Sequence, residues 1–250
     1  TFSERSCLRN ELHGLENLAL IPGTVGGAPI QNIGAYGVEI AQFISEVEVL
    51  ELETGKIRLF TRKECEFAYR DSIFKNQLSN QIVVLSVSFQ LNQGRPPNIS
   101  YPSLYEAIEI ELTKISGGPE VTPQLIFDTV CRIRRAKLPD PAVIGNAGSF
   151  FKNPVVSQSK HDQLRDQFSD LPSFPISDTD LVKIPAAWLL DQAGWRGRSR
   201  GAAGVHKDHA LVLVNLGEAT GEEILLLAQE MSQSTLDRYG IALETEVRII

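Results

Sequence analysis

The sequence has few cysteines and no long apolar run. Cys7, Cys65 and Cys131 are odd in number and widely spaced, and no C-x-x-C motif occurs among the 250 residues. This pattern disfavours a disulfide framework and a zinc site, so we expect no metal and a reducing, cytoplasmic environment. No apolar stretch approaches the roughly 20 residues of a membrane helix, so we also expect no membrane partner.

Positive charge is scarce as well. The chain has 24 Lys and Arg against 31 Asp and Glu, which gives a formal net charge of -7. Such an acidic chain is poorly suited to nucleic acid, and no nucleic-acid partner is expected. One local basic cluster, RIRRAKLPDP at residues 132–141, contrasts with this background. It is either a solvated helix end favoured by the helix dipole or a clamp for a phosphate or carboxylate.

The two common glycine fingerprints of nucleotide sites are absent. The sequence contains neither G-x-G-x-x-G nor G-x-x-x-x-G-K-[ST]. What it does contain is an apolar, glycine-rich stretch, IPGTVGGAPIQNIGAYG, at residues 21–37. Glycine lets a backbone adopt positive φ and approach a ligand closely. The stretch is therefore either a packed turn or a loop whose backbone lies against a large flat cofactor.

Periodicity and turn residues predict a mixture of helices and strands without repeats. A hairpin is predicted over residues 44–60, with Thr54-Gly55 as its turn and a bulge where the alternation slips at 49/50. The last predicted helix has a capping box, Thr220 with Glu223, and Gly240 at its C-terminal end. The other predicted elements are a strand over 81–91 with Leu85, Val87, Phe89 and Leu91 on one face, a helix over about 122–136, and a strand over 241–250.

Ser149, in GNAGSFFKNP at residues 145–154, is a candidate for proton transfer. The motif G-x-S-x-G does not surround it, and no histidine lies within ten residues, so an activated serine nucleophile is not indicated. One interpretation is a turn hydroxyl bonded to the backbone. The other is a proton donor. Because a hydroxyl is a very weak acid, it can donate only to a strongly basic centre such as an enolate, which favours reduction of an activated double bond over hydrolysis.

Two charged residues are candidates for the same chemistry. Arg70, in FAYRDSIFK, is either an ion-pair partner of Asp71 or Glu66 or a bidentate ligand of a carboxylate. Glu246, in LETEVR, lies on a predicted charge ladder that faces solvent or belongs to the site. Together with Ser149 and a lysine they form a constellation beside a flavin-sized glycine loop.

Six motifs follow one another along the chain: GLENLALIPGTVGGAPIQNIGAYGVEI, FAYRDSIFK, RRAKLPDP, GNAGSFFKNP, LLDQAGWRG and LETEVR. In these motifs the sequence resembles, over essentially its whole length, the type I UDP-N-acetylenolpyruvoylglucosamine reductases (UDP-N-acetylmuramate dehydrogenases), flavoenzymes of bacterial peptidoglycan precursor synthesis. The resemblance implies an α+β protein with a vanillyl-alcohol-oxidase-like (PCMH-type) FAD-binding domain, present in part, and an α+β substrate-binding domain. We assign residues 1–91 to the C-terminal part of the FAD-binding domain, 92–240 to the substrate-binding domain, and 241–250 to a closing strand that returns Glu246 to the active site.

The resemblance also implies the chemistry: NADPH-dependent reduction of UDP-N-acetylglucosamine enolpyruvate to UDP-N-acetylmuramate through FAD. Ser149 matches the family's proton donor, and Arg70 with Glu246 matches the pair that stabilises the enolic intermediate. The matches to substrate contacts are Tyr69, Tyr101, Lys137, Asn153 and His209. The matches to flavin contacts are Ile21, Pro22, Gly23, Gly26, Gly27, Ile30, Gln31, Gly34, Ala35 and Arg134.

The sequence departs from the family pattern at its start. The family's first segment carries another glycine turn that grips the FAD diphosphate, and the chain begins at Thr1 without it, so we expect an N-terminal segment to be missing. Two alternatives stay open: a flavin-free module that binds a sugar nucleotide, and a sugar oxidase on the same scaffold. We expect a monomer in the bacterial cytoplasm.

Overall fold

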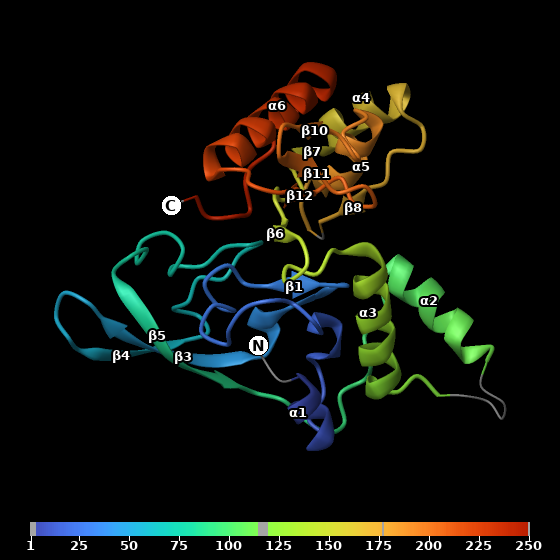
Figure 1. Ribbon diagram of the computed structural model, residues 1–250. Coiled ribbons are helices and arrows are strands. Elements are labelled where there is room, and N and C mark those ends of the chain that lie inside the picture. Colours follow the sequence, from blue (N-terminus) through green and yellow to red (C-terminus); the bar gives the residue numbers. More distant parts are fainter. Residues whose placement is uncertain (1–3, 115–119, 177, 250) are drawn as a thin grey trace. The chain divides into compact units, whose positions relative to one another are not determined.

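The computed structural model describes residues 4–114, 120–176 and 178–249. By compactness the chain divides into two units, residues 1–134 and 135–250 (Figure 1). The predicted boundary at residue 92 separates a part assigned to FAD binding from a part assigned to substrate binding. Compactness does not test that assignment, so it stays a prediction.

The first unit combines a small antiparallel sheet with three helices. The sheet has the strand order β4-β3-β5, and a two-stranded hairpin, β1-β2, precedes it in the chain. Figure 1 shows α2 and α3 side by side, and their apolar faces form one cluster. The elements are α1 (Glu4–Arg9), the 3₁₀ turns η1 (Glu16–Leu18) and η2 (Ile40–Gln42), β1 (Gly34–Ala35), β2 (Val38–Glu39), β3 (Ile44–Glu51), β4 (Ile57–Thr61), β5 (Ile82–Phe89), α2 (Pro102–Leu112) and α3 (Pro123–Lys137).

The hairpin predicted over residues 44–60 is confirmed by β3 and β4, which pair in regular register. The bulge predicted at 49/50 is off by one position, because the register of β3 with β5 shifts between Glu48 and Val49. The extra residue belongs to β5: Leu85 is passed over between the residues that pair with β3, Val84 and Ser86. Leu85 therefore faces solvent and does not share the inward face of β5, as the alternation had suggested.

One face of the sheet is buried and the other is exposed. Val47 and Val49 of β3 and Phe60 of β4 are almost fully buried, together with Phe43 just before β3. Each such side chain contributes about 1.5–3 kcal/mol through burial. The glycine-rich stretch packs on this cluster through Ile21, Ile30 and several other apolar residues of the stretch.

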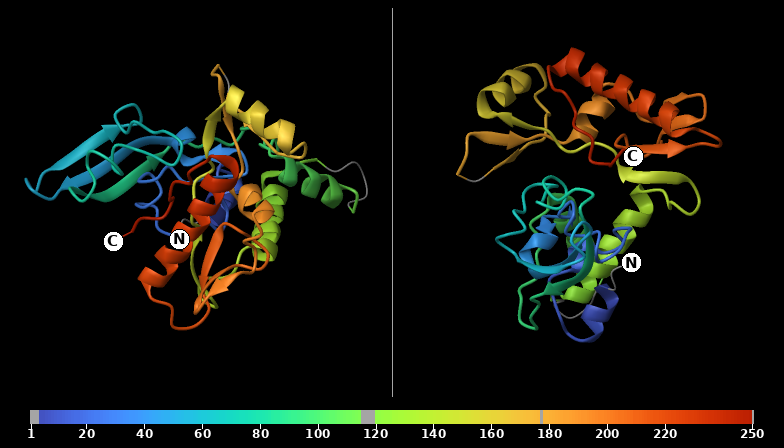
Figure 2. Two further views of the ribbon diagram at one scale, coloured as in Figure 1. Left: turned by 90° about the horizontal axis from the view of Figure 1, so that it is seen from above. Right: turned by 90° about the vertical axis from the view of Figure 1, so that its left-hand side faces the viewer.

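The second unit has two antiparallel sheets and three helices. The strand orders are β10-β11-β12-β6 and β7-β9-β8. The long helix α6, red in Figure 2, packs on β11 and β12 and beside α5. The elements are β6 (Gly145–Ser149), β7 (Val155–Ser157), α4 (Gln158–Gln167), β8 (Phe174–Pro175), β9 (Leu181–Lys183), α5 (Ala186–Gln192), β10 (Ser199–Arg200), β11 (Ala203–Val205), β12 (Val212–Asn215) and α6 (Gly221–Tyr239).

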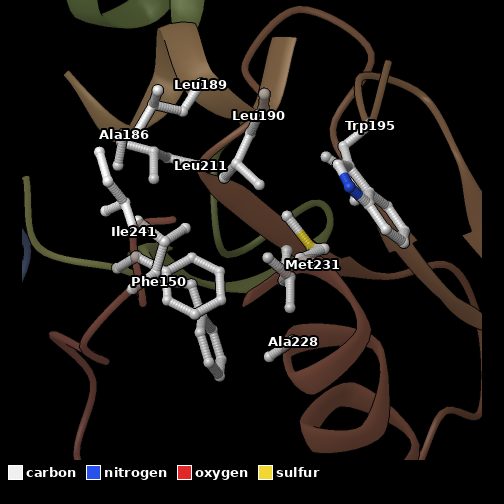
Figure 3. Packing of buried hydrophobic residues seen from close by; sticks show 14 of the residues in the cluster. Phe150, Ala186, Leu189, Leu190, Trp195, Leu211, Ala228, Met231 and Ile241 are labelled. Atoms are coloured by element: carbon white, nitrogen blue, oxygen red, sulfur yellow. The ribbon is translucent and has the colours of Figure 1, made fainter. Parts of the chain in front are cut away.

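Helix α6 has the ends that the sequence predicts. Thr220 and Glu223 form a reciprocal capping box, and Gly240 takes a left-handed conformation at φ 64°. These local signals satisfy backbone groups that the helix itself leaves without partners. Met231 and Ala228 on its inner face join the core of the second unit, where Phe150 also packs (Figure 3).

The strand predicted over residues 241–250 is wrong for the described residues 241–249. Only Thr245 forms an isolated antiparallel bridge, opposite Phe151. The apolar residues that alternate in the sequence, Ile241 and Leu243, are buried in the core below α6 instead of lining one face of a sheet. Ile250 lies outside the described residues.

Candidate active site

The glycine-rich stretch lines a cavity of about 160 Å³ in the first unit. Gly23 has φ 126°, a conformation that side chains other than glycine rarely adopt, although a Cβ would meet no neighbouring atom. Gly26 lies against Val84. Glu4 and several apolar residues line the cavity. Five of the residues predicted to contact flavin line it as well: Ile21, Pro22, Gly23, Gly27 and Gln31.

Arg134, also predicted to contact flavin, is held near this cavity in an incompletely paired state. Its Nε group is buried and has no hydrogen-bond partner within the part of the chain that the structure describes. Burial lowers the pKa of Arg134, while Tyr36, Cys131 and Glu4, which lines the cavity, act electrostatically in the opposite direction. A buried donor without a partner is costly, and a bound acceptor would satisfy it. The unpaired donor of Arg134 therefore fits an anionic group of a bound cofactor.

Arg70 lies in a tight turn against the β1–β2 hairpin. The turn is closed by two backbone hydrogen bonds between Ala68 and Asp71, each 3.1 Å long, and Arg70 has φ 54°. Its Nη2 group donates to the carbonyl oxygen of Gly34 at 2.5 Å, and its guanidinium lies 5.2 Å from the ring centre of Tyr69. The side chain is 15% exposed. The predicted residues Arg70, Tyr69 and Gly34 are thus neighbours.

Tyr101 stands at the N-terminal end of α2, beside the end of the glycine-rich stretch. Its ring meets the ring of Tyr36 edge to face, with 5.5 Å between the centres. Asn17 ties the two segments together, because its Nδ2 group donates to the backbone oxygens of Tyr36 and Asn98, both at 2.9 Å. Burial raises the pKa of both tyrosines, so their hydroxyl groups stay protonated and can donate hydrogen bonds.

The segments that carry Ser149 and Glu246 lie side by side within the second unit. Ser149 ends β6, and the next residue, Phe150, accepts a backbone hydrogen bond from the N–H of Glu246 at 2.8 Å. A second bond, from the N–H of Lys152 to the oxygen of Glu244 at 2.9 Å, closes the same antiparallel bridge. The backbone of Glu246 is therefore fixed against the residue that follows Ser149.

A cluster of titratable side chains surrounds His209 in the same unit. Burial lowers the pKa of His209, Lys137 and His206 lower it further, and Asp191 opposes them. The Nδ1 atom of His209 accepts a hydrogen bond from the N–H of Leu211 at 3.3 Å, which fits a neutral imidazole. His209 and Lys137, both predicted to contact substrate, therefore lie within electrostatic reach of each other.

Two predicted residues have structural partners as well. The side-chain oxygen of Asn153 accepts from the N–H of Ala186 at 2.9 Å, at the first residue of α5. Ala35 lies in β1 and pairs with Val38. In the ranges 4–114, 120–176 and 178–249, no group of three or more His, Cys, Asp and Glu side chains is arranged to hold a metal ion. In the same ranges no helix is both long and apolar enough to cross a membrane.

Two family models match the chain. Residues 140–250 match the family model described as the C-terminal domain of UDP-N-acetylenolpyruvoylglucosamine reductase, and residues 4–61 match an FAD binding domain. The chain is 44% identical to the UDP-N-acetylenolpyruvoylglucosamine reductase of Photobacterium profundum, over 97% of this chain and 67% of the relative. It is 48% identical to the enzyme of that name from Paraburkholderia phymatum, over 96% of this chain and 68% of the relative.

The chain belongs to the UDP-N-acetylenolpyruvoylglucosamine reductase family. It spans about two thirds of the length of these relatives. The crystal structure of the UDP-N-acetylenolpyruvylglucosamine reductase of Thermus caldophilus has the same fold, with a TM-score of 0.64 and 24% identity over 98% of this chain and 66% of that one. The predicted fold class is confirmed: the match to a PCMH-type FAD-binding domain is followed by the match to the reductase family's C-terminal domain.

The sequence reasoning missed three buried or half-buried polar residues of this reductase fold. Asn17, Asn32 and Glu39 lie within or next to the glycine-rich stretch and hydrogen-bond across it. A polar residue inside an otherwise apolar, glycine-rich segment is the available signal, because a buried amide needs partners. That signal does not say which segment supplies the partners.

Proposed function

We propose that this chain carries the active-site residues of an NADPH-dependent, FAD-containing reductase that converts UDP-N-acetylglucosamine enolpyruvate to UDP-N-acetylmuramate in the bacterial cytoplasm. The observation that carries the proposal is the register of Ser149 and Glu246, in a chain 44–48% identical to reductases of this name. These backbone bonds hold the segment that carries Glu246 at the end of β6, where Ser149 lies.

Bound FAD would supply the hydride that NADPH provides and that adds to the methylene carbon of the enolpyruvyl double bond. The protein's own residues then act on the other carbon. Hydride addition leaves an electron pair at the carbon that bears the carboxylate, so negative charge spreads onto the carboxylate oxygens. The Ser149 hydroxyl gives its proton to that carbon. One hydride and one proton together saturate the double bond.

Arg70 suits the charge that develops in this step. A guanidinium matches a carboxylate with two parallel N–H donors, and it lowers the energy of an enolic intermediate more than that of the neutral double bond. The contact to Gly34 and the Tyr69 ring restrict its motion. We assign Glu246 to the same intermediate, as the resemblance implies.

The remaining predicted residues bind the two ends of the reactants. Lys137, which is exposed, and His209, which is half-buried, lie within electrostatic reach of each other and suit the substrate's anionic groups, and Tyr101 and Asn153 are assigned to substrate contact. The cavity lined by the glycine-rich stretch, with the unpaired donor of Arg134, fits the flavin.

Deuterium labelling in heavy water tests the proposal. We expect solvent deuterium at the product carbon that bears the carboxyl group, and Ser149→Ala should slow oxidation of the reduced flavin by substrate by about 10²–10⁴-fold, the usual worth of a general acid. Reduction of FAD by NADPH should be unchanged. Ser159→Ala, at an exposed position in α4, is the matched control.

Two results would contradict the assignment. Product without deuterium at that carbon would exclude protonation from an exchangeable hydroxyl. Equal loss of both half-reactions in Ser149→Ala would point to a structural role. A colourless protein that binds the sugar nucleotide would favour the flavin-free alternative, and steady peroxide formation from a free sugar would favour an oxidase.

A further inference from the structure

The β1–β2 hairpin forms a platform under the guanidinium of Arg70. Gly34 and Glu39 are directly opposite each other in this hairpin. Arg70 reaches both of them: Nη2 donates to the Gly34 oxygen at 2.5 Å, and Nη1 lies 4.0 Å from Oε1 of Glu39. The same Nη1 group also donates to the backbone oxygen of Asn32 at 3.5 Å. One charged side chain is therefore contacted by three residues of the glycine-rich stretch and its hairpin.

Asn32 connects this platform to the turn that carries Arg70. It is 1% exposed and has φ 45°. Its Nδ2 group donates to Oε2 of Glu39 at 3.0 Å and to the oxygen of Ala68 at 2.9 Å, and its Oδ1 atom accepts from the N–H of Ala41 at 3.1 Å. One buried amide thus orients the carboxylate beside the guanidinium and the backbone two residues before it.

The position of Gly34 leaves no room for a side chain at the contact. A Cβ at Gly34 would lie 2.8 Å from Nη1 of Arg70 and 2.9 Å from the backbone oxygen of Val38. Gly34 does not have the left-handed backbone that would itself require glycine. Close approach of the guanidinium is therefore a sufficient reason for glycine at this position.

We propose that Asn32 and Glu39 are positioning residues for Arg70: they set the orientation of its guanidinium from below and act on the reaction only through it. This inference rests on the proposed function for the role of Arg70, but not for the geometry. Arginine has a long side chain with many rotamers, so its fixed orientation has to be imposed by partners. A guanidinium that is 1 Å out of place stabilises a developing carboxylate charge far less.

Glu39→Gln is the primary test, because it keeps the size of the side chain and removes its charge. We expect kcat to fall about fivefold or more, with KM for NADPH changed by less than about twofold, because only the substrate-facing step uses Arg70. Glu53→Gln, at an exposed position in the β3–β4 turn, is the matched control and should leave both constants unchanged.

Arginine-selective ¹⁵N NMR gives a readout that does not depend on turnover. A held guanidinium rotates slowly about its terminal bond and shows separate Nη resonances. We expect these resonances for Arg70 in the unmodified protein and in Glu53→Gln, and a single averaged resonance in Glu39→Gln. Arg70→Lys identifies the signal by removing it.

Asn32→Asp is the second variant. It keeps a residue type that tolerates positive φ, but it replaces a donor with a carboxylate facing Glu39, and like charges repel. We expect the same averaged Arg70 resonance and the same fall in kcat. If this variant does not fold, Glu39→Gln decides.

Unchanged Arg70 resonances in Glu39→Gln, or kcat within about twofold of the unmodified protein, would overturn the positioning role. Absence of reductase turnover in the unmodified protein with FAD bound would instead refute the proposed function, and the NMR comparison would still test the orientation of Arg70.

Discussion

Gly34→Ala should destabilise the first unit by about 1–3 kcal/mol, the usual cost of overpacking a well-packed site. The added methyl group would meet two atoms at less than normal contact distance, Nη1 of Arg70 at 2.8 Å and the backbone oxygen of Val38 at 2.9 Å. If the guanidinium withdraws, its hydrogen bond to the Gly34 oxygen is lost, and a hydrogen bond to a charged group contributes about 1.5–3 kcal/mol. If the hairpin yields instead, the β1–β2 pairing is distorted. Both routes lead to a cost of about 2 kcal/mol.

Gly26→Ala is the matched control in the same stretch. Its Cβ would lie 3.5 Å or more from Val84, an ordinary contact, and its backbone is not left-handed. Such a change is neutral or stabilises by about 0.4–1 kcal/mol, because alanine restricts the unfolded chain.

Hydrogen exchange of the β3 amides, such as those of Val47 and Val49, is the appropriate assay for both variants. The two tryptophans, Trp188 and Trp195, lie in the second unit, so their fluorescence does not report on the first. Equal protection in Gly34→Ala and Gly26→Ala would refute the argument that Arg70 and Val38 crowd the Gly34 position.

Three further predictions concern charge, pH and capping. Arg70→Lys should lower kcat for the enolpyruvyl substrate by about 10²–10³-fold in steady-state assays, because an ammonium group lacks the two parallel donors; near-normal turnover would remove Arg70 from the mechanism. Burial lowers the pKa of His209 below its ordinary value of about 6.5, so protonation of this side chain favours the unfolded state. The resulting loss of folding stability is absent above pH 6.5 and grows as the pH falls toward the pKa of His209 in the folded protein. His209→Gln should reduce the loss of stability below pH 6.5 in urea titrations followed by tryptophan fluorescence, and an unchanged pH profile would contradict this. Thr220→Ala should cost about 1 kcal/mol in the same titration at neutral pH, because it breaks the capping box, whereas no change would mean that the cap contributes nothing.

Local sequence signals predicted the local structure well. The ends of α6, the helix from Pro123 and the turn between β3 and β4 each depend on residues a few positions apart, so a short stretch of sequence contains the interaction that forms them. The same locality explains the failures. Leu85 fits the alternation of apolar and polar residues in the sequence. The face to which its side chain points nevertheless depends on how β5 pairs with β3, which lies more than 30 residues earlier in the chain.

The site shows the same division. By itself the sequence determined the family, the glycine-rich stretch and the candidate residues Ser149, Arg70 and Glu246, because each is recognisable within a short motif. Only the tertiary structure decided that Glu246 lies beside β6 through a bridge rather than on a long strand, and that Asn32 and Glu39 support Arg70. Hydrogen bonds between segments distant in sequence decide these positions. A buried amide such as that of Asn32 shows that it needs partners, but only the folded chain determines which groups satisfy it.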